Sequence, residues 1–185
     1  MDALEALHTR SSSPRLGGDP PAPAMLEKIF QAALRAPDHA LLRPWRFLTI
    51  EGDARLKLGD LFAQAATLKD PEAAEAAVEK ARGKPLRAPL IVVIIAKPTE
   101  HPSVPAIEQV ISAGTAAHGM LVAAHSLGVG AMWRTGGMAY HPHVMAGLGL
   151  GIDEQIVGFL YMGEIQGRAR NVPELPVSDY FQAWS

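Results

Sequence analysis

Cysteine is absent from the 185 residues of the sequence, and no apolar run is long. The first absence excludes disulfides, thiolate metal ligands and a cysteine nucleophile, and it fits a reducing cytoplasm. The longest apolar run, from Leu90 to Ala96, is far below the ~20 residues of a membrane-spanning helix. The first ten residues, MDALEALHTR, carry an early acid and predict an amphipathic helix rather than a signal peptide. We therefore expect a cytoplasmic protein that does not enter a membrane.

Neither sign of charge is in excess. The chain has 17 Lys and Arg residues against 19 Asp and Glu residues, a formal net charge of -2. Nothing in this balance points to nucleic acid as a partner. The hydrophobic content of 48% is enough for a substantial core, and the length suits a single domain over residues 1–185.

Several familiar active-site motifs are missing. No G-x-S-x-G elbow, P-loop or EF-hand loop is present. His118 with His125, and His141 with His143, lack the spacing and carboxylate partners of a zinc site, so we predict no metal. The stretch Gly147–Gly151, GLGLG, resembles a dinucleotide fingerprint, but it follows a predicted helix rather than a strand and favours a helix C-cap turn.

Apolar periodicity predicts helices with short strands scattered between them, which indicates an α+β layered domain. The sheet could be mixed, and a doubly wound parallel fold is the less favoured alternative because the strand spacing is irregular. The run at 90–96 is continuously apolar and predicts a central strand buried on both faces. Other strands are predicted at 46–51, 128–133 and 155–162, and helices at 3–10, 25–34, 53–68, 71–82, 107–127 and 141–148.

Three segments have an unusual composition. The helical region at about 53–85 is expected to be a surface excursion, because the hydrophobic stripe of its second helix is thin. The helix at 107–127 is dense in Ala, Gly and Ser, which indicates either a tightly packed core helix or a subunit interface. The tail at 167–185 has three aromatic residues but no regular period. We expect this tail to reach a second subunit, where its apolar side chains can be buried.

Two turns that contain arginine are candidate anion sites. In Arg10–Arg15, RSSSPR, two guanidinium groups flank three hydroxyls, which could cradle a phosphate or form an ordinary solvated turn. In Ala131–Gly137, AMWRTGG, a strand delivers Trp133, Arg134 and Thr135 into a glycine turn. The glycines let the backbone approach a flat or charged group, and a plain crossover turn is the alternative.

A third candidate is Arg35–Trp45, RAPDHALLRPW, which has more polar and rigid chemistry than a connector needs. The proline after Ala36 requires an extended backbone directly after a helix, so the next N–H groups could face a ligand. The alternative is a stapled helix C-terminus, in which Trp45 is buried and Arg35 contacts the last carbonyl groups.

Four pieces of the sequence, in this order, resemble the nitroreductase family of FMN-dependent oxidoreductases and its short NAD(P)H-nitroreductase branch. They are MDALEALHTRSSSPRL, RAPDHALLRPWRF, the small-residue helix ending in GVGAMWRTGG, and IVGFLYMGEI with the NVPELP tail. The resemblance covers nearly the whole chain. It implies a three-layer α/β/α fold with a central mixed or antiparallel sheet. It also implies an intertwined homodimer with FMN at the subunit interface and with the helix at 107–127 in the dimer contact.

The resemblance assigns roles to individual residues. Those that match FMN-contacting positions of the family are Arg10, Ser11, Ser12, Arg35, His39, Trp133, Arg134 and Thr135. Those that match a region assigned to NAD(P) in the related branch are Ala123, Ala124, His125, Ser126, Leu127 and Gly128. The second set reads better as buried helix. The family often has arginine where Ser11 stands and glutamine where Arg43 stands, so Arg15 and Arg43 are further candidates for contact with the cofactor.

The function implied by the resemblance is a two-step redox reaction. NAD(P)H passes hydride to FMN, and a nitroaromatic, a quinone or a similar electron-poor small molecule is then reduced in the same pocket by a ping-pong mechanism. Arg35 is expected to stabilise anionic reduced flavin, and His39 to bond the ring edge or deliver a proton, so these two are the catalytic candidates. The alternative is a dimeric flavin-binding store or sensor that does not turn over.

Overall fold

The computed structural model describes residues 1–168 and 171–185, and its central element is an antiparallel sheet. The central strand β3 (Leu90–Ala96) lies between β2 (Trp45–Glu51) and β5 (Gln155–Ile165). β5 also pairs with β4 (Gly130–Arg134) and, at its end, with the short β1 (Leu16–Gly17). Each of these pairings is antiparallel, so the doubly wound parallel alternative is wrong.

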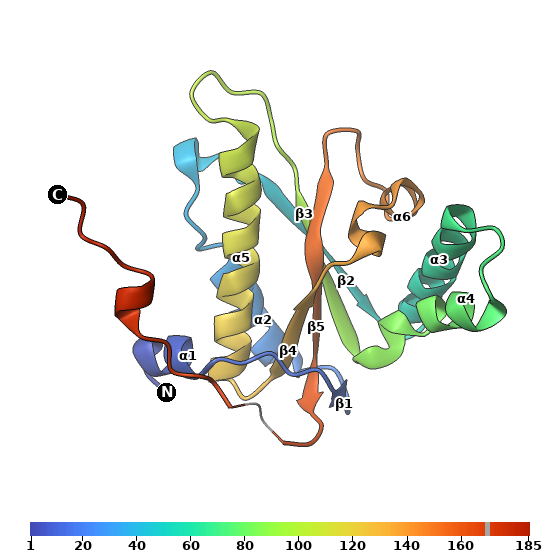
Figure 1. Ribbon diagram of the computed structural model, residues 1–185, viewed down its shortest axis with the longest axis horizontal. Coiled ribbons are helices and arrows are strands. Elements are labelled where there is room, and N and C mark those ends of the chain that lie inside the picture. Colours follow the sequence, from blue (N-terminus) through green and yellow to red (C-terminus); the bar gives the residue numbers. More distant parts are fainter. Residues whose placement is uncertain (169–170) are drawn as a thin grey trace.

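Helices cover both faces of this sheet, which confirms the three-layer α+β architecture (Figure 1). α2 and α5 pack on one face, and α3 and α6 pack on the other. α1 is capped by Asp2, whose Oδ1 accepts a hydrogen bond from the Glu5 N–H at 2.9 Å. The α-helices in the described chain are α1 (Ala3–Thr9), α2 (Pro23–Ala33), α3 (Ala54–Lys69), α4 (Glu75–Arg82), α5 (Ala106–Ser126) and α6 (Pro142–Gly147).

Strand β3 is buried along its whole length, as its continuous apolar run predicts. Successive side chains of a strand point to opposite faces, so β3 contributes to two separate cores. Leu90, Val92 and Ile94 face α2 and α5. The alternate residues, Ile91, Val93 and Ile95, face α3 and α6. Antiparallel strands commonly expose one face to solvent. β3 is apolar along its whole length because helices cover both faces of the sheet.

Small residues on α5 permit close packing within one chain. Ala113, Ala116 and Ala117 are fully buried in the core shared with α2 and the sheet. A Cβ added at Gly119 would lie 2.9 Å from the carbonyl oxygen of Ala32 in α2. Tight packing within one chain therefore explains the small residues of α5 without a subunit interface. A subunit contact made by α5 has to use other residues.

The segment at about 53–85 differs from the surface excursion expected of it. α3 buries Leu58, Phe62 and Ala65 in the core. The Phe62 ring packs edge-on against Phe159 of β5, with ring centroids 5.6 Å apart. α4 is more peripheral and buries Ala81. The burial of α3 was missed because its few large apolar residues are diluted by alanine and charged residues.

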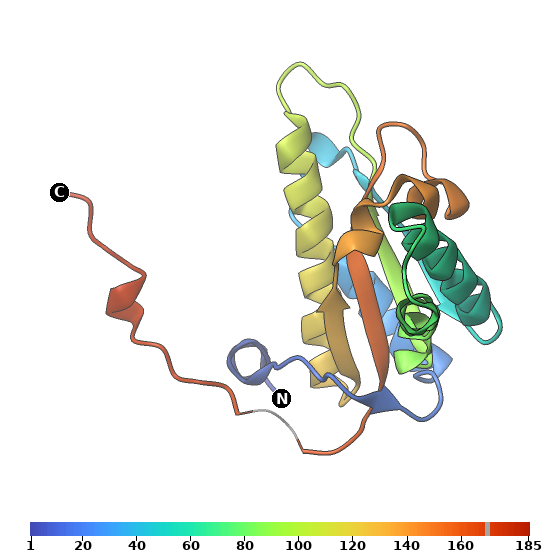
Figure 2. The same cartoon turned by 45° about the vertical axis from the view of Figure 1, so that its right-hand side comes forward.

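Apolar side chains remain exposed on the body of the chain and along its tail. The tail leaves the body in both views (Figures 1 and 2). Phe181 is 76% exposed and Trp184 is 100% exposed. Large apolar residues exposed elsewhere include Leu4, Leu7, Leu34, Leu41, Ile107 and Ile111. A single copy therefore leaves these large apolar side chains in water, where a second surface could cover them.

One ion pair ties the loop before β5 to strand β2. Arg46 donates from Nε and Nη2 to the two carboxylate oxygens of Glu154, at 2.7 and 2.6 Å. The Gly151 N–H donates to the same carboxylate at 2.9 Å. The Arg46 hydrogen bonds, followed by the smaller effects of Gly151 and of nearby charge, outweigh burial and lower the pKa of Glu154 to about 2.

We predict that Glu154→Gln lowers the free energy of unfolding at pH 7 by about 1–3 kcal/mol, because it removes a charge-assisted pair from a partly buried guanidinium. The folded-state pKa is depressed, so this stabilisation is present above the ordinary carboxyl pKa of 4.5 and disappears as pH falls towards 2. Urea unfolding between pH 7 and pH 2.5 measures the difference, with Glu100→Gln as an exposed control. A difference that does not shrink with pH would contradict the assignment.

Candidate functional site

A pocket of about 330 Å³ opens beside β4, on the face of the sheet that α3 covers. Phe62, Met138 and Phe159 are among its apolar walls, and its volume is within the range of small-molecule sites. Gly136, with φ of 73°, turns the chain after β4 in a left-handed conformation that favours glycine. The turn Thr135–Gly137 therefore forms part of the pocket, as the glycine pattern suggested.

Trp133 is among the residues that line the pocket, and its ring packs against the α2/α5 core, over a glycine of the neighbouring strand. Its Nε1 donates to the carbonyl of Val157 at 3.4 Å. A Cβ at Gly158 would lie 2.0 Å from this nitrogen, so no other residue fits beneath the indole without moving it. The position of the Trp133 ring therefore depends on Gly158.

Arg134 is a cation with an incomplete set of partners in this pocket. Its Nη2 donates to the carbonyl of Pro14 at 3.3 Å, and its guanidinium carbon lies 5.3 Å from the centroid of the Tyr161 ring. Its Nε is buried and has no hydrogen-bond partner among residues 1–168 and 171–185. Burial, with a smaller effect of Arg87, lowers the pKa of Arg134. A buried donor in this state is expected where a ligand with acceptor atoms completes the site.

Lys84 and Arg87 bring further positive charge into the pocket from the turn that precedes β3. Burial, followed by repulsion from Arg87 and other cations, lowers the pKa of Lys84. Burial also raises the pKa of Tyr161 to about 12, against the opposing effect of Arg134, so the phenol is neutral at pH 7. No carboxylate lines the pocket within the described part of the chain. The arrangement suits an anionic or electron-rich ligand.

The N-terminal candidate residues lie along β4. The Ser13 N–H donates to the carbonyl of Ala131 at 3.0 Å, so the segment after α1 runs beside the strand. Arg10 and Ser11 line a small cavity with His125. The structure thus places the two predicted arginine-containing turns, around Arg10 and Arg134, side by side at one edge of the sheet.

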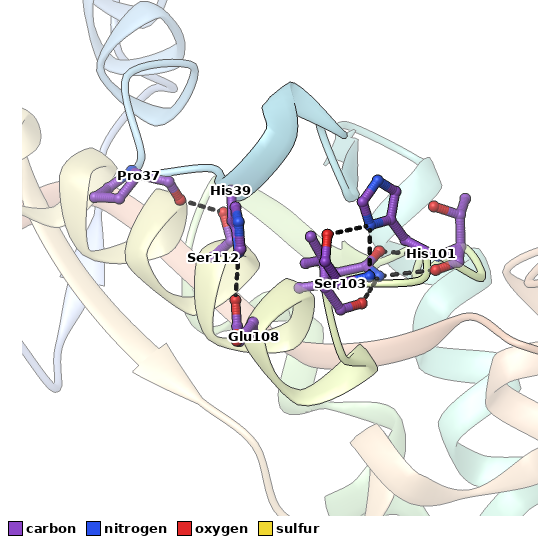
Figure 3. Close-up of polar contacts among 9 residues, drawn as sticks. Pro37, His39, His101, Ser103, Glu108 and Ser112 are labelled. Carbon is purple, nitrogen blue, oxygen red and sulfur yellow. Dashed lines mark hydrogen bonds and ion pairs between the residues drawn. The ribbon is translucent and has the colours of Figure 1, made fainter.

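Arg35 and His39 lie apart from this edge. Both are exposed, and neither lines the pocket beside β4. Their loop packs near the start of α5, where Ser112 Oγ donates to the carbonyl of Pro37 at 2.5 Å and His39 Nδ1 lies 2.9 Å from Glu108 Oε2 (Figure 3). α5 covers the face of the sheet opposite to the pocket. Within one chain, the structure does not bring Arg35 and His39 together with Arg134.

The other candidate residues have plainer surroundings. Ala123–Gly128 forms the last turn of α5 and its end, with Ala124 fully buried. His125 Nε2 lies 2.9 Å from Thr9 Oγ1 and connects α5 to α1. The Arg15 and Arg43 residues are exposed.

Two further features bear on the kind of site. Among the described residues, no three His, Asp or Glu side chains are grouped so that they could hold a metal ion. No helix in the same part of the chain has both the length and the apolar character needed to cross a membrane.

Sequence reasoning missed Lys84, Arg87 and Tyr161. The two cations stand in a polar turn, GKPLRAP, that looked like the end of a surface helix. Tyr161 stands in a strand where an aromatic residue needs no further explanation. The available signal was the position of two cations just before the most apolar strand. Only the fold shows that this turn lies beside the end of β4.

Comparison with known proteins places this geometry in context. Residues 7–164 match the model of the "Nitroreductase family". The chain is 40% identical, over 185 residues, to the "Putative NAD(P)H nitroreductase YdjA" of Escherichia coli (strain K12), and the match covers 98% of this chain and 100% of that protein.

Solved structures with a similar fold are more distant in sequence. The nitroreductase-like family protein from Bacillus cereus is 22% identical, with a TM-score of 0.85 over 100% of this chain and 96% of that chain. The FMN and NADPH-dependent nitroreductase NfnB from sphigopyxis sp. strain HMH is 18% identical, with a TM-score of 0.79 over 100% of both chains. These likenesses concern the fold.

We predict that Arg134→Met raises the free energy of unfolding of the ligand-free protein by about 1 kcal/mol, because the native guanidinium is desolvated, lacks one partner and is repelled by Arg87. Urea unfolding at pH 7 of protein freed of small molecules measures the effect. Arg35→Met replaces an exposed arginine and should change stability little. A clear loss of stability in Arg134→Met would show that the guanidinium already has adequate partners.

Proposed function

Because the chain belongs to the nitroreductase family, we propose that it is an FMN-dependent oxidoreductase that takes hydride from NAD(P)H and reduces a nitroaromatic, quinone or similar electron-poor acceptor. The observation that carries the proposal is the cationic pocket beside β4, with its buried and unpartnered Arg134 Nε. Bound FMN would accept and donate the electrons in a ping-pong cycle, so no side chain has to act as a nucleophile.

The residues of the pocket fit this cofactor. A flavin ring is flat and largely apolar, which suits walls formed by Phe62, Met138 and Phe159. Reduced flavin carries negative charge, and a pocket that presents Lys84 and Arg134, with no carboxylate among the described residues that line it, would favour that form. The buried Nε supplies a donor that is already desolvated, so a ligand acceptor gains the full hydrogen bond.

The phosphate of the cofactor would be held by the segment that runs along β4. Arg10, Ser11 and Ser12 provide one guanidinium and two hydroxyls. Arg134 ends the adjacent strand β4, and Thr135 follows it. Serine at position 11 contributes a weaker phosphate ligand than arginine would. Arg15 is close in sequence and exposed, so it can supply the second charge.

We propose that the active unit is a homodimer in which each site uses both copies. Arg35 and His39 lie on the opposite side of their own chain from the pocket, so they would complete the pocket of the partner. The exposed apolar residues of α1, α5 and the tail provide the surface for such an interface. In this arrangement Arg35 adds positive charge beside the flavin, and His39 contacts the ring edge or the acceptor.

We predict that the purified protein is yellow, or becomes yellow on addition of FMN, and that it then oxidises NAD(P)H in the presence of a quinone such as menadione. Absorbance at the flavin and nicotinamide wavelengths measures both properties. Failure to bind FMN would contradict the cofactor assignment. FMN binding without NAD(P)H oxidation across a panel of acceptors would instead favour a flavin store or sensor.

We predict that deletion of residues 171–185 weakens dimerisation at least about tenfold, because it removes Tyr180, Phe181 and Trp184, each of which can bury a large apolar area against a second copy. Sedimentation velocity over a range of micromolar concentrations measures the dissociation constant. A control for the loss of negative charge is Glu174→Gln with Asp179→Asn in the intact tail, which removes the two acidic side chains of the deleted segment and should leave the constant unchanged. Equal dimerisation with and without the tail would contradict its role.

A further inference from the structure

The loop between α2 and β2 holds its backbone in an unfavourable conformation. Ala40, Leu41 and Arg43 have φ of 61°, 54° and 49°, a left-handed region that residues with side chains rarely occupy. The Leu41 side chain is 78% exposed, so the conformation does not serve to bury it in the chain's own core. Backbone of this kind persists only where surrounding contacts impose it, and such places are often functional.

Polar contacts fix this loop on both sides of His39. Asp38 Oδ2 accepts from the Arg43 N–H at 2.7 Å and closes the loop on itself. Ser112 Oγ of α5 donates to the carbonyl of Pro37 at 2.5 Å and fastens the loop to the helix. These two hydrogen bonds hold the backbone around His39 independently of any contact that the His39 side chain makes.

The His39 side chain is in turn oriented by a contact with Glu108 of α5. Glu108 Oε2 lies 2.9 Å from His39 Nδ1, across 69 positions of sequence. Figure 3 shows that Glu108 and Ser112, one turn apart on α5, both point to the loop. An ionised carboxylate only accepts hydrogen bonds, so Nδ1 has to carry a proton and Nε2 is left to meet another group. This contact selects both the ring orientation and the tautomer of His39.

A plainer explanation accounts for Glu108 only in part. An acid in the first turn of a helix is favourable because of the helix dipole, and Glu108 is in the first turn of α5. That effect requires only the charge. It does not require the carboxylate to contact a histidine in a loop whose backbone is separately fastened by Ser112.

We infer that Glu108 is a positioning residue that holds His39 as the Nδ1–H tautomer, with Nε2 free for a flavin or acceptor. The inference rests on the proposed function, in which His39 works at the partner's pocket. Glu108 lies between Ile107 and Ile111, which are 63% and 60% exposed. A second copy that covers these isoleucines would remove water from the Glu108–His39 pair and strengthen its hydrogen bond.

The first test observes His39 directly and does not depend on turnover. Long-range ¹H–¹⁵N spectra of the full-length protein, with histidine labelled and with FMN absent or added, report the tautomer, and His39→Ala identifies the signal. We expect the Nδ1–H form in the native protein and in Glu108→Gln, whose amide oxygen also accepts. Glu108→Ala should shift His39 towards the tautomer mixture of free imidazole. Glu100→Ala, in the neighbouring loop, is the matched control and should leave the signal unchanged.

The second test connects the tautomer to catalysis. With menadione as acceptor, Glu108→Ala should lower kcat/KM about five- to tenfold at unchanged FMN content, and Glu108→Gln should restore most of it. Glu108→Ala should cost little when His39 is already alanine, because the two residues act as one unit.

The two tests separate the inference from the function it rests on. An unchanged His39 tautomer in Glu108→Ala overturns the inference, whether or not the protein binds FMN. Additive losses in the double variant overturn it as well. Failure of every variant and of the native protein to bind FMN overturns the proposed function instead, and the tautomer measured without FMN still decides whether Glu108 orients His39.

Discussion

Burial of β3 on both faces is the constraint from which the rest of the structure follows. Its alternating side chains require helices on each side, which α2 and α5 provide on one face and α3 and α6 on the other. Polar chemistry is consequently excluded from the interior of the sheet and collects where strands end. The pocket beside β4 and the loop that leads into β2 are two such places, and they lie on opposite faces.

Because the loop with Arg35 and His39 lies on the other face, the charge of the pocket within one chain comes from Lys84, Arg87 and Arg134. These three residues share a partly desolvated space with a neutral Tyr161, and no carboxylate of residues 1–168 or 171–185 lines it. This arrangement is unfavourable until an anion enters. In the proposed dimer, the partner contributes the loop with Arg35 and His39, and bound FMN supplies the acceptor atoms that Arg134 Nε lacks.

The parts of this account that were predictable from sequence are those with strong local signals. The β-branched run at 90–96 predicted the central strand, and the glycines after Arg134 predicted a turn, either one that approaches a ligand or a plain crossover. The burial of α3 was not predictable from its pattern, because Phe62 and Leu58 are surrounded by alanine and charge. Lys84, Arg87 and Glu108 were missed for a different reason. Their roles depend on which distant segment lies beside them, and a sequence read one segment at a time does not contain that information.

The central claim is that each site is completed by two copies of the chain, and mixed dimers test it most directly. Arg35→Ala and Arg134→Met, each carrying a different affinity tag, are mixed and allowed to exchange subunits. A mixed dimer has one site with both substitutions and one site with neither. The account predicts that two nearly inactive variants regain, on mixing, roughly a quarter of the native NAD(P)H oxidation rate. If mixed dimers form, as shown by sequential capture on both tags, and activity stays at the level of the separate variants, the shared site is contradicted.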